Sequence, residues 1–280
     1  MEAVYEKYFR DNLPHIWCPG CGNGIVMSAL ARALDKLGYP QDDILLVSGI
    51  GCSSRMSGYM DLNTVHTAHG RALAFATGAK VCEPRLKTFV VMGDGDAAAI
   101  GGNHFIHACR RNIDMTAIVI NNSIYGMTGG QFSPLTPTGK RATTAPYGSI
   151  DRAFNLVDLA KGAGATYVAR GDVFHAAQLT NLLVEASRHK GFAVVEAVAT
   201  CPISFGRYNN IPEPADMLFW LRDNTVTVQQ AAKMSDEELK DKIIIGKHFE
   251  TEAVEYCEEM AGLLADKQAD NEKAGDENEV

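Results

Sequence analysis

Two aspartates, Asp94 and Asp96, lie in the glycine-rich stretch GDGDAAAIGG, directly after a run of apolar residues. Further along the chain, Asn121 and Asn122 follow a second apolar run. Carboxylate and amide oxygens are hard ligands that suit Mg²⁺ or Ca²⁺, and Mg²⁺ is usually completed by a phosphate. The glycines that flank Asp94 would let the backbone approach such a phosphate, whose charge is favoured at the start of a helix. The alternative role of Asp94 is to cap that helix.

Four cysteines form a second group of candidate ligands. Cys18 and Cys21 lie in WCPGCG, Cys52 lies in GIGCSS and Cys201 lies in TCP. Four thiolates suit either a tetrahedral zinc ion or an iron–sulfur cluster, and a C-x-x-C pair alone could also be a redox dithiol. The remaining cysteines are isolated in the sequence, and we expect them to be buried structural thiols: Cys82, Cys109 and Cys257.

The composition limits the class of protein in which these ligands act. The 280 residues are 46% apolar, which is enough to bury a substantial core. A formal net charge of −8 argues against a nucleic-acid-binding surface. The longest apolar runs are too short to span a bilayer and the N-terminus is charged, so we expect a cytoplasmic protein that does not bind membranes. Seven cysteines in that setting are expected to be reduced.

Apolar runs rich in β-branched residues alternate with longer helical stretches. This pattern predicts an α/β protein with a mainly parallel, twisted sheet and helices on both faces. The expected strands are Ile44–Ser48, Thr88–Met92, Met115–Ile120, Thr166–Ala169 and Ala193–Val198. The expected helices are Gly24–Leu37, Gly70–Lys80, Gly101–Arg110, Arg152–Gly162 and Val173–His189. The carboxyl ends of neighbouring parallel strands share one edge of the sheet, where ligands bind, so Asp94 and the two asparagines should lie close together.

The chain is expected to divide near residue 210. Residues 1–210 form the α/β domain, whereas residues 211–264 are predicted to form an arm and short helices that pack on this domain or on a partner. The arm is the extended stretch IPEPADMLFWLRDNT, whose hydrophobic residues are expected to be covered either by its own domain or by a partner. The last segment, 265–280, is acidic with few large apolar residues and is expected to fray.

Further local signals concern helices and one long loop. A capping box at Ser235 and Glu238 predicts a helix start, and the stretch from Thr251 to Leu264 predicts a short amphipathic helix. The segment Tyr125–Gly148 is rich in turns and long for a connection, which is typical of a functional or mobile loop.

The GDG turn and the asparagine pair resemble the signature of thiamine diphosphate enzymes. In that family the aspartate, the second asparagine and a backbone carbonyl two residues later hold Mg²⁺ against the diphosphate. The resemblance therefore implies that the metal ligands are Asp94, Asn122 and the carbonyl oxygen of Ile124. It also implies that Asp96 stays within reach of the diphosphate or of the neighbouring backbone.

The cysteines make the resemblance narrower. From WCPGCG to CPISFGRYNN, over residues 14–210, the chain resembles the β subunit of the 2-oxoacid:ferredoxin oxidoreductases, most closely the 2-oxoglutarate type. The stretches GIGCS, HTAHGRALAFATG, NNSIYGMTGGQ and SPLTPTG also carry this resemblance. It implies the thiamine diphosphate-binding fold and one [4Fe–4S] cluster, held by Cys18, Cys21, Cys52 and Cys201.

The resemblance also implies which residues bind the cofactor and act on the substrate. The implied cofactor-binding residues are Ile50, Gly51, Cys52, Ser53, His69, Gly93, Asp94, Gly95, Asp96, Asn122, Gly126 and Met127. For His69 we favour a positioning role near the cofactor over proton transfer, with a structural histidine as the alternative. Arg55 is a candidate to pair with the distal carboxylate of a dicarboxylic oxoacid, and a surface arginine is the alternative. Weaker candidates for this contact are Arg207, Lys140 and Arg141.

The implied activity is the coenzyme A-dependent oxidative decarboxylation of 2-oxoglutarate to succinyl-CoA, reversible for CO₂ fixation. Thiamine diphosphate supplies the carbanion chemistry, and the cluster passes electrons to ferredoxin. Two alternatives remain open at this point. The substrate could be pyruvate, a branched-chain oxoacid or an aryl 2-oxoacid, or the chain could be a zinc-stabilised α/β binding module in which GDG is only a capped turn.

The resemblance implies a partner as well. Thiamine enzymes need a carboxylate beside the aminopyrimidine ring, and no glutamate of this chain lies in a glycine-flanked strand end suited to that role. In the resembled family the α subunit supplies this glutamate, in an αβ dimer of dimers. We therefore expect the chain to be inactive without that partner.

Overall fold

The computed structural model describes residues 2–276 and contains an eight-stranded sheet with the order β2-β1-β3-β4-β8-β7-β10-β9. The strands are β1 (Ile44–Ser48), β2 (Asn63–His66), β3 (Lys87–Gly93), β4 (Met115–Asn121), β7 (Tyr167–Asp172), β8 (Phe192–Val198), β9 (Thr225–Thr227) and β10 (Ile243–Glu250). Neighbouring strands are parallel except for β7 and β10, which pair antiparallel. The expected α/β fold with a mainly parallel sheet is confirmed.

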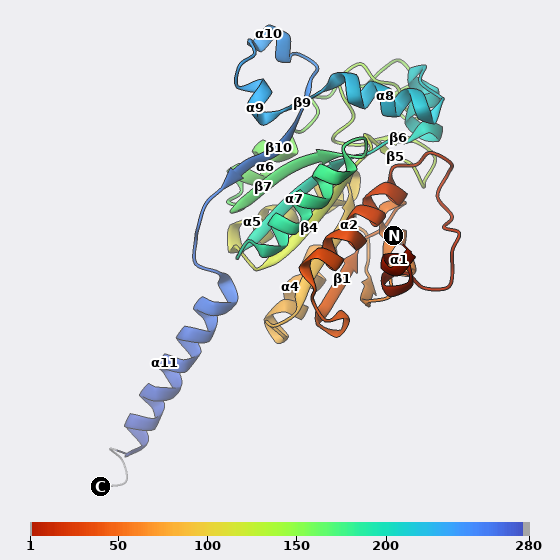
Figure 1. Ribbon diagram of the computed structural model, residues 1–280. Helices are drawn as coiled ribbons and strands as arrows, with labels where there is room; N and C mark the ends of the chain where they lie inside the picture. Colours follow the sequence, from red (N-terminus) through yellow and green to blue (C-terminus); the bar gives the residue numbers. More distant parts are fainter. Residues whose placement is uncertain (1, 277–280) are drawn as a thin grey trace.

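Helices cover both faces of the sheet, as expected (Figure 1). On one face α2 (Asn23–Leu37) and α7 (Ala176–Arg188) pack over strand residues that include Leu46 and Phe89. On the other face α4 (Ala72–Cys82), α5 (Gly102–Arg111) and α6 (Leu156–Gly162) pack over the intervening strand residues, such as Leu45 and Val90. Successive residues of a buried strand thus serve two cores, which explains why these strands are continuous apolar runs.

Two short helices and a hairpin complete the N-terminal three-quarters of the chain. Helices α1 (Glu2–Tyr8) and α3 (Met56–Tyr59) pack near β1 and β2, and the bridge between Phe9 and Met60 ties the N-terminal segment to α3. The long loop after β4 begins with a small antiparallel pair, β5 (Ile124–Tyr125) and β6 (Gln131–Phe132).

The segment after residue 210 differs from the expected extended arm. Residues Pro214–Asn224 form helix α8, in which Met217 and Leu221 are buried one turn apart. The prolines of this segment suggest extended chain, but Pro214 occupies the first turn of the helix, where its missing N–H costs nothing. The expectation of an extended arm is therefore wrong over most of its length.

The same region supplies strands that the sequence reasoning missed. After β9 come the short helices α9 (Val228–Ala231) and α10 (Asp236–Leu239), and the expected capping box at Ser235 and Glu238 starts α10. Strand β10 then pairs with β7, so this region extends the main sheet.

Helix α11 (Tyr256–Asp276) points away from the sheet (Figure 1). It starts later and runs further than the expected helix from Thr251 to Leu264, and it includes much of the acidic segment 265–280. Residues 277–280 of that segment lie outside the described part of the chain. Across residues 2–276, no helix is both long and apolar enough to cross a bilayer.

Candidate active site

Four consecutive parallel strands direct the predicted ligands to one edge of the sheet. Cys52 follows β1, Asp94 directly follows β3, Asn122 directly follows β4 and Cys201 follows β8. These strands are neighbours in the order β1-β3-β4-β8, and all four run in the same direction. The carboxyl edge of the sheet therefore brings the oxygen ligands and two of the cysteines together, although they are far apart in sequence.

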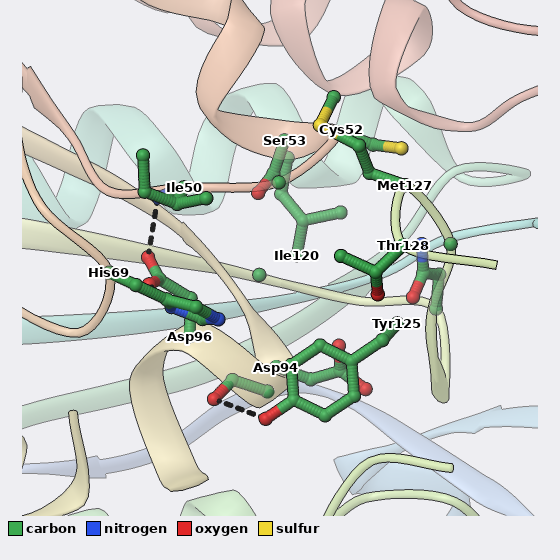
Figure 2. Close-up of a pocket in the computed structure, with 15 residues that line it drawn as sticks. Ile50, Cys52, Ser53, His69, Asp94, Asp96, Ile120, Tyr125, Met127 and Thr128 are labelled. Carbon is green, nitrogen blue, oxygen red and sulfur yellow. Dashed lines mark hydrogen bonds and ion pairs between the residues drawn. The ribbon is translucent and has the colours of Figure 1, made fainter. Parts of the chain in front are cut away.

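A cavity opens at this edge, and Figure 2 shows the side chains that line it. The lining contains all twelve residues that the resemblance implies for cofactor binding. The three further lining residues, which the sequence reasoning did not name, are Ile120, Tyr125 and Thr128. Ile120 is the next-to-last residue of β4, and Tyr125 and Thr128 lie in the first residues of the turn-rich loop. Their closeness in sequence to the asparagine pair is the signal that could have identified them as lining residues.

Asp94 is a buried carboxylate in this cavity. It is 3% exposed and accepts a hydrogen bond from the Ser133 hydroxyl at 2.6 Å. Burial raises the pKa of Asp94 to about 7, although the Ser133 hydroxyl and the Gly95 backbone oppose this shift. A buried carboxylate is costly unless its charge is compensated, and a divalent cation would compensate it.

Asn122 and Ile124 provide further oxygens of the kind that Mg²⁺ prefers. The Ile124 N–H donates to Asn122 Oδ1 at 3.3 Å, which folds the two residues into a tight turn. An amide oxygen has two lone pairs, so Asn122 Oδ1 can accept this bond and still bind a cation. A carboxylate, an amide oxygen and a backbone carbonyl form a hard-oxygen donor set that fits Mg²⁺.

A buried polar chain holds the turn after β4 in shape. Arg170 Nε donates to Glu196 Oε2 at 2.7 Å, and Asn121 Nδ2 donates to Glu196 Oε1 at 2.7 Å. Asn121 Oδ1 in turn accepts from the N–H of Ser123 at 3.0 Å. Ser123 has a φ of 61°, a left-handed conformation that needs such support. These hydrogen bonds fix the conformation of the turn and thereby the direction in which the Asn122 side chain points.

His69 and Asp96 form a close pair in the cavity wall (Figure 2). His69 Nδ1 lies 2.5 Å from Asp96 Oδ1, and Asp96 also accepts from the N–H groups of Gly70 at 2.6 Å and Ile50 at 3.3 Å. Because a carboxylate only accepts, Nδ1 carries the proton, and Nε2 of a neutral ring is left as the acceptor. Asp96 therefore anchors His69 and the Ile50 loop rather than standing as a free carboxylate.

Tyr125 explains one of the glycines in GDG. Its hydroxyl donates to the Gly95 carbonyl at 3.0 Å, and a Cβ at Gly95 would lie 2.2 Å from the Tyr125 ring. Burial raises the pKa of Tyr125, and the charges of Asp94 and Asp96 raise it further, so the hydroxyl stays protonated and able to donate. Gly95 is thus required by this side chain as well as by any close approach of a phosphate.

The WCPGCG turn is tied to the two strand ends that carry the other cysteines. Trp17 Nε1 donates to the carbonyl of Cys52 at 2.7 Å. The Gly22 N–H donates to the carbonyl of Thr200, the neighbour of Cys201, at 3.0 Å. These contacts bring the C-x-x-C pair to the edge of the sheet that already carries the cavity.

The four thiols lie close enough to influence one another. The pKa of Cys52 is raised to about 11, chiefly by burial and in part by the charges of Cys21, Cys201 and Cys18. A Cβ at Gly126, which lines the cavity, would lie 3.6 Å from both Cys52 Sγ and Cys201 Sγ. The thiol group and the cavity therefore share a wall made by Cys52 and Gly126.

The spacing of these thiols bears on the zinc alternative. Within residues 2–276, no three Cys, His, Asp or Glu side chains are grouped so that they could hold a single metal ion. A zinc site would need its sulfurs about 2.3 Å from one centre. An iron–sulfur cluster instead spreads its thiolates over several iron atoms, so wider spacing suits it.

Comparisons with known proteins agree with this geometry. A family model described as the thiamine pyrophosphate enzyme, C-terminal TPP binding domain, matches residues 49–197. The chain is 52% identical over 259 residues to the 2-oxoglutarate synthase subunit KorB of Methanocaldococcus jannaschii, covering 92% of this chain and 96% of that one. The chain belongs to the KorB family of 2-oxoglutarate synthase subunits. The resemblance inferred from the sequence motifs is thus confirmed.

Other relatives of this KorB-family chain support the assignment. The KorB subunit of Archaeoglobus fulgidus is 49% identical, covering 94% of this chain and 95% of its own. The solved structure of a 2-oxoglutarate:ferredoxin oxidoreductase from Magnetococcus marinus, with 2-oxoglutarate, coenzyme A and succinyl-CoA bound, is similar with a TM-score of 0.83 and 34% identity. That match covers 92% of this chain and 89% of the other. The matching family model is a thiamine diphosphate-binding domain, and the KorB relatives are named as subunits of 2-oxoglutarate synthase.

Two further groups in this KorB-family chain lie outside the cavity lining. Arg55 is exposed in the 3₁₀ turn Ser53–Arg55, beside the lining residues Cys52 and Ser53. Glu196 is buried near Asp94, but both of its carboxylate oxygens are bound to Arg170 and Asn121. Glu196 is therefore not available to act on a cofactor.

Proposed function

We propose that this chain is the β subunit of a 2-oxoglutarate:ferredoxin oxidoreductase that converts 2-oxoglutarate and coenzyme A to succinyl-CoA and CO₂. The observation that carries this proposal is the shared sheet edge, where a hard-oxygen pocket adjoins four thiols. The first group suits a metal-bound diphosphate and the second suits an iron–sulfur cluster. Such a pairing gives electrons from decarboxylation a short route out of the site, towards ferredoxin.

Mg²⁺ is assigned to Asp94, Asn122 and the carbonyl oxygen of Ile124. The buried carboxylate of Asp94 supports this assignment, because a cation offsets the cost of its burial. Ser133 donates to one Asp94 oxygen, which leaves the other for the metal. The turn fixed by Asn121 and Ser123 keeps the amide oxygen of Asn122 pre-oriented.

One [4Fe–4S] cluster is assigned to Cys18, Cys21, Cys52 and Cys201. Their mutual electrostatic influence and the contacts of the WCPGCG turn with both strand ends support a single site. Cys18 is exposed, whereas the other three are partly buried, so the cluster would face solvent on the Cys18 side. That side is the natural exit for electrons towards ferredoxin.

Thiamine diphosphate, when bound, supplies the carbanion chemistry of the decarboxylation. Asp96 holds the His69 ring in one tautomer, so that Nε2 is positioned as a hydrogen-bond acceptor in the cavity. Arg55, which is exposed beside the cavity, is assigned to the distal carboxylate of 2-oxoglutarate. Pyruvate lacks that carboxylate, so this contact favours a dicarboxylic substrate.

The activating glutamate is assigned to a partner α subunit, in an αβ dimer of dimers. Glu196 is paired with Arg170. Glu255, the second glutamate that is buried within the described part of the chain, accepts from the backbone of Asp114 and Glu258. Neither side chain is free to contact a cofactor in the cavity. The thiamine site is therefore completed between two chains.

The test is a pair of variants in the purified complex, with iron, sulfide and thiamine measured together. Asp94→Asn should abolish Mg²⁺-dependent thiamine diphosphate binding and leave the iron content unchanged. Cys201→Ser should lower the iron content, whereas Cys82→Ser should not, because Cys82 lies outside the site. The expectation that Cys82 is a buried thiol is wrong, since it is exposed at the end of α4, whereas Cys109 and Cys257 are buried as expected. Stoichiometric zinc in a colourless complex would refute the cluster assignment.

The substrate is tested separately by comparing turnover of 2-oxoglutarate, pyruvate and a branched-chain 2-oxoacid by the same complex. We expect 2-oxoglutarate to have the highest kcat/KM. A preference for a monocarboxylic acid would refute the role of Arg55 and leave the cofactor assignments in place.

A further inference from the structure

Asn23, the first residue of α2, points its side-chain amide at one of the four thiols. Its Nδ2 lies 3.2 Å from Cys21 Sγ, within hydrogen-bond distance of a sulfur acceptor, and the residue is only 1% exposed. Burial raises the pKa of the Cys21 thiol, and the backbone N–H and side-chain amide of Asn23 oppose this shift. The Cys21 sulfur therefore accepts from the first residue of a helix that runs to Leu37, at the positive end of that helix.

The carbonyl oxygen of the same amide, Asn23 Oδ1, is unfavourable for the stability of the fold. Asn23 Oδ1 is buried and has no hydrogen-bond partner among the described residues. A buried carbonyl oxygen without a partner costs desolvation free energy, so an apolar residue of similar shape would suit this position better. Nearby buried positions of α2, such as Val26 and Met27, are indeed apolar. The amide is therefore retained for its donor rather than for packing.

We propose that Asn23 raises the reduction potential of the [4Fe–4S] cluster by donating a hydrogen bond from Nδ2 to the Cys21 sulfur. The inference rests on the proposed function, which assigns the cluster to this thiol group. Reduction adds one electron to the cluster and increases the negative charge on its sulfurs. An N–H dipole aimed at a sulfur stabilises the reduced form more than the oxidised form. Asn23 acts through Cys21 and touches no substrate, so it is a positioning residue.

The comparison with Cys201 shows why Asn23 is the position to test. Burial raises the pKa of Cys201, and this shift is opposed by the backbone N–H groups of Ser204 and Phe205 and by the Ser204 hydroxyl, which also donates to the Gly126 carbonyl at 3.4 Å. Side-chain substitution does not remove backbone donors. At Cys21 the buried amide of Asn23 is a side-chain donor, so a substitution removes one hydrogen bond and leaves the ligand set intact.

The experiment is a redox titration of the cluster, followed by electron paramagnetic resonance, in the purified complex of this chain with its partner. Asn23→Leu preserves the shape and removes the donor, and Asn23→Asp also places a negative charge beside the sulfur. We expect the equilibrium constant for cluster reduction by dithionite to fall in both variants, by up to about tenfold in Asn23→Leu, which is ~59 mV for one electron. The fall should be larger in Asn23→Asp.

The control is Asn103→Asp, which adds the same charge at an exposed position on α5 and should leave the potential unchanged. Thermal unfolding separates tuning from a structural role: Asn23→Leu should be at least as stable as the wild type, because it removes an unpaired buried oxygen. An unchanged potential in Asn23→Leu, or loss of iron from it, would overturn the inference. Absence of a cluster from the wild-type complex would instead refute the proposed function.

Discussion

Asp96 binds groups from two segments of the chain, the Ile50 loop and the His69–Gly70 pair. The sequence reasoning placed Asp96 within reach of the diphosphate or of the neighbouring backbone, and in the structure it lines the cavity and accepts from the backbone N–H groups of Ile50 and Gly70. A single side chain thus fixes the tautomer of His69 and the position of the loop that leads to Cys52. This double role depends on how two loops meet at the sheet edge, which sequence spacing does not reveal.

We predict that Asp96→Asn lowers turnover of the assembled enzyme by about tenfold to hundredfold. This range is typical of residues that orient a functional side chain, here His69, through a hydrogen bond. The amide cannot accept from His69, Gly70 and Ile50 together, so His69 loses its fixed tautomer. Steady-state kinetics measure the loss, and iron content should be unchanged. Asp43→Asn, at a surface carboxylate paired with Arg85, is the control. Turnover within twofold of the wild type would contradict the prediction.

The sequence predicts those residues of the site that belong to a motif. It does not predict the residues that reach the site only through contacts made by the folded chain. GDG, NN and GIGCS place their residues at strand ends, so their meeting follows from parallel strand order alone. Ser133, Glu196 and Arg170 act through contacts across long stretches of chain, such as the hydrogen bond of Ser133 to Asp94. Nothing in their local sequence marks those contacts.

At the scale of elements, the turn after β1 is fitted against Asp96. A Cβ at Gly49 would lie 1.8 Å from Asp96 Oδ2, so no other residue fits without displacing that carboxylate. Gly58, in α3, has nothing within 4 Å of its added Cβ. Neither glycine has a φ in the left-handed range, so the difference that matters for an added methyl group is the space around each position.

We predict opposite effects of alanine at these two positions. Gly49→Ala should lower the free energy of unfolding by about 1–3 kcal/mol, the usual cost of overpacking, and should weaken thiamine diphosphate binding. Gly58→Ala should leave stability equal or raise it by up to about 1 kcal/mol, because alanine favours a helix. Chemical denaturation and cofactor titration measure both effects. Equal stability of the two variants would contradict the prediction, because it would show that the Asp96 carboxylate can move away from the added methyl group with no loss of folding free energy.

Strand β10 shows where the element predictions failed. Ile243 to Ile245 are β-branched, yet they follow a charged, helix-like segment and precede Gly246, whose φ is 127°. The strand pairs antiparallel with β7, and a bulge lies between Lys247 and Phe249. The alternating pattern of parallel strands and crossover helices, which predicted the earlier strands, does not extend to this end of the sheet, where β10 lies between β7 and β9.

The histidine of β10 gives this strand a pH dependence. Burial lowers the pKa of His248, while its hydrogen bond to the carbonyl of Ile244 raises it and the charge of Arg170 lowers it. A base with a lowered pKa in the folded state binds its proton more readily when unfolded. Its contribution to stability is therefore full above the unfolded pKa of about 6.5 and is lost as the pH falls below it.

We predict that His248→Gln makes stability less dependent on pH in that range. The measurement is the difference in unfolding midpoint between about pH 7.5 and about pH 5.5, which should be smaller in the variant than in the wild type. Glutamine keeps a donor for the carbonyl of Ile244 and does not titrate. An identical acid-induced loss in both proteins would show that His248 does not contribute.

At the scale of the whole molecule, no glutamate of the described residues lines the cavity. We therefore predict that the chain is inactive without a partner subunit that supplies the activating glutamate. The purified chain alone should reduce no ferredoxin with 2-oxoglutarate and coenzyme A, and addition of the partner subunit should restore the activity. The physical reason is that Glu196 and Glu255 are both held by other groups. Turnover by the isolated chain would contradict the prediction that the partner subunit supplies the activating glutamate.

The wall that Cys52 and Gly126 form between the thiols and the cavity also concerns how the protein matures. In the proposed enzyme, the bond from Cys52 to the cluster would also hold one side of the cavity, so we expect thiamine diphosphate to bind more weakly before iron is delivered. We expect assembly to proceed in one order, with the inorganic centre first. In an iron-starved cell, extra thiamine would then fail to restore the enzyme.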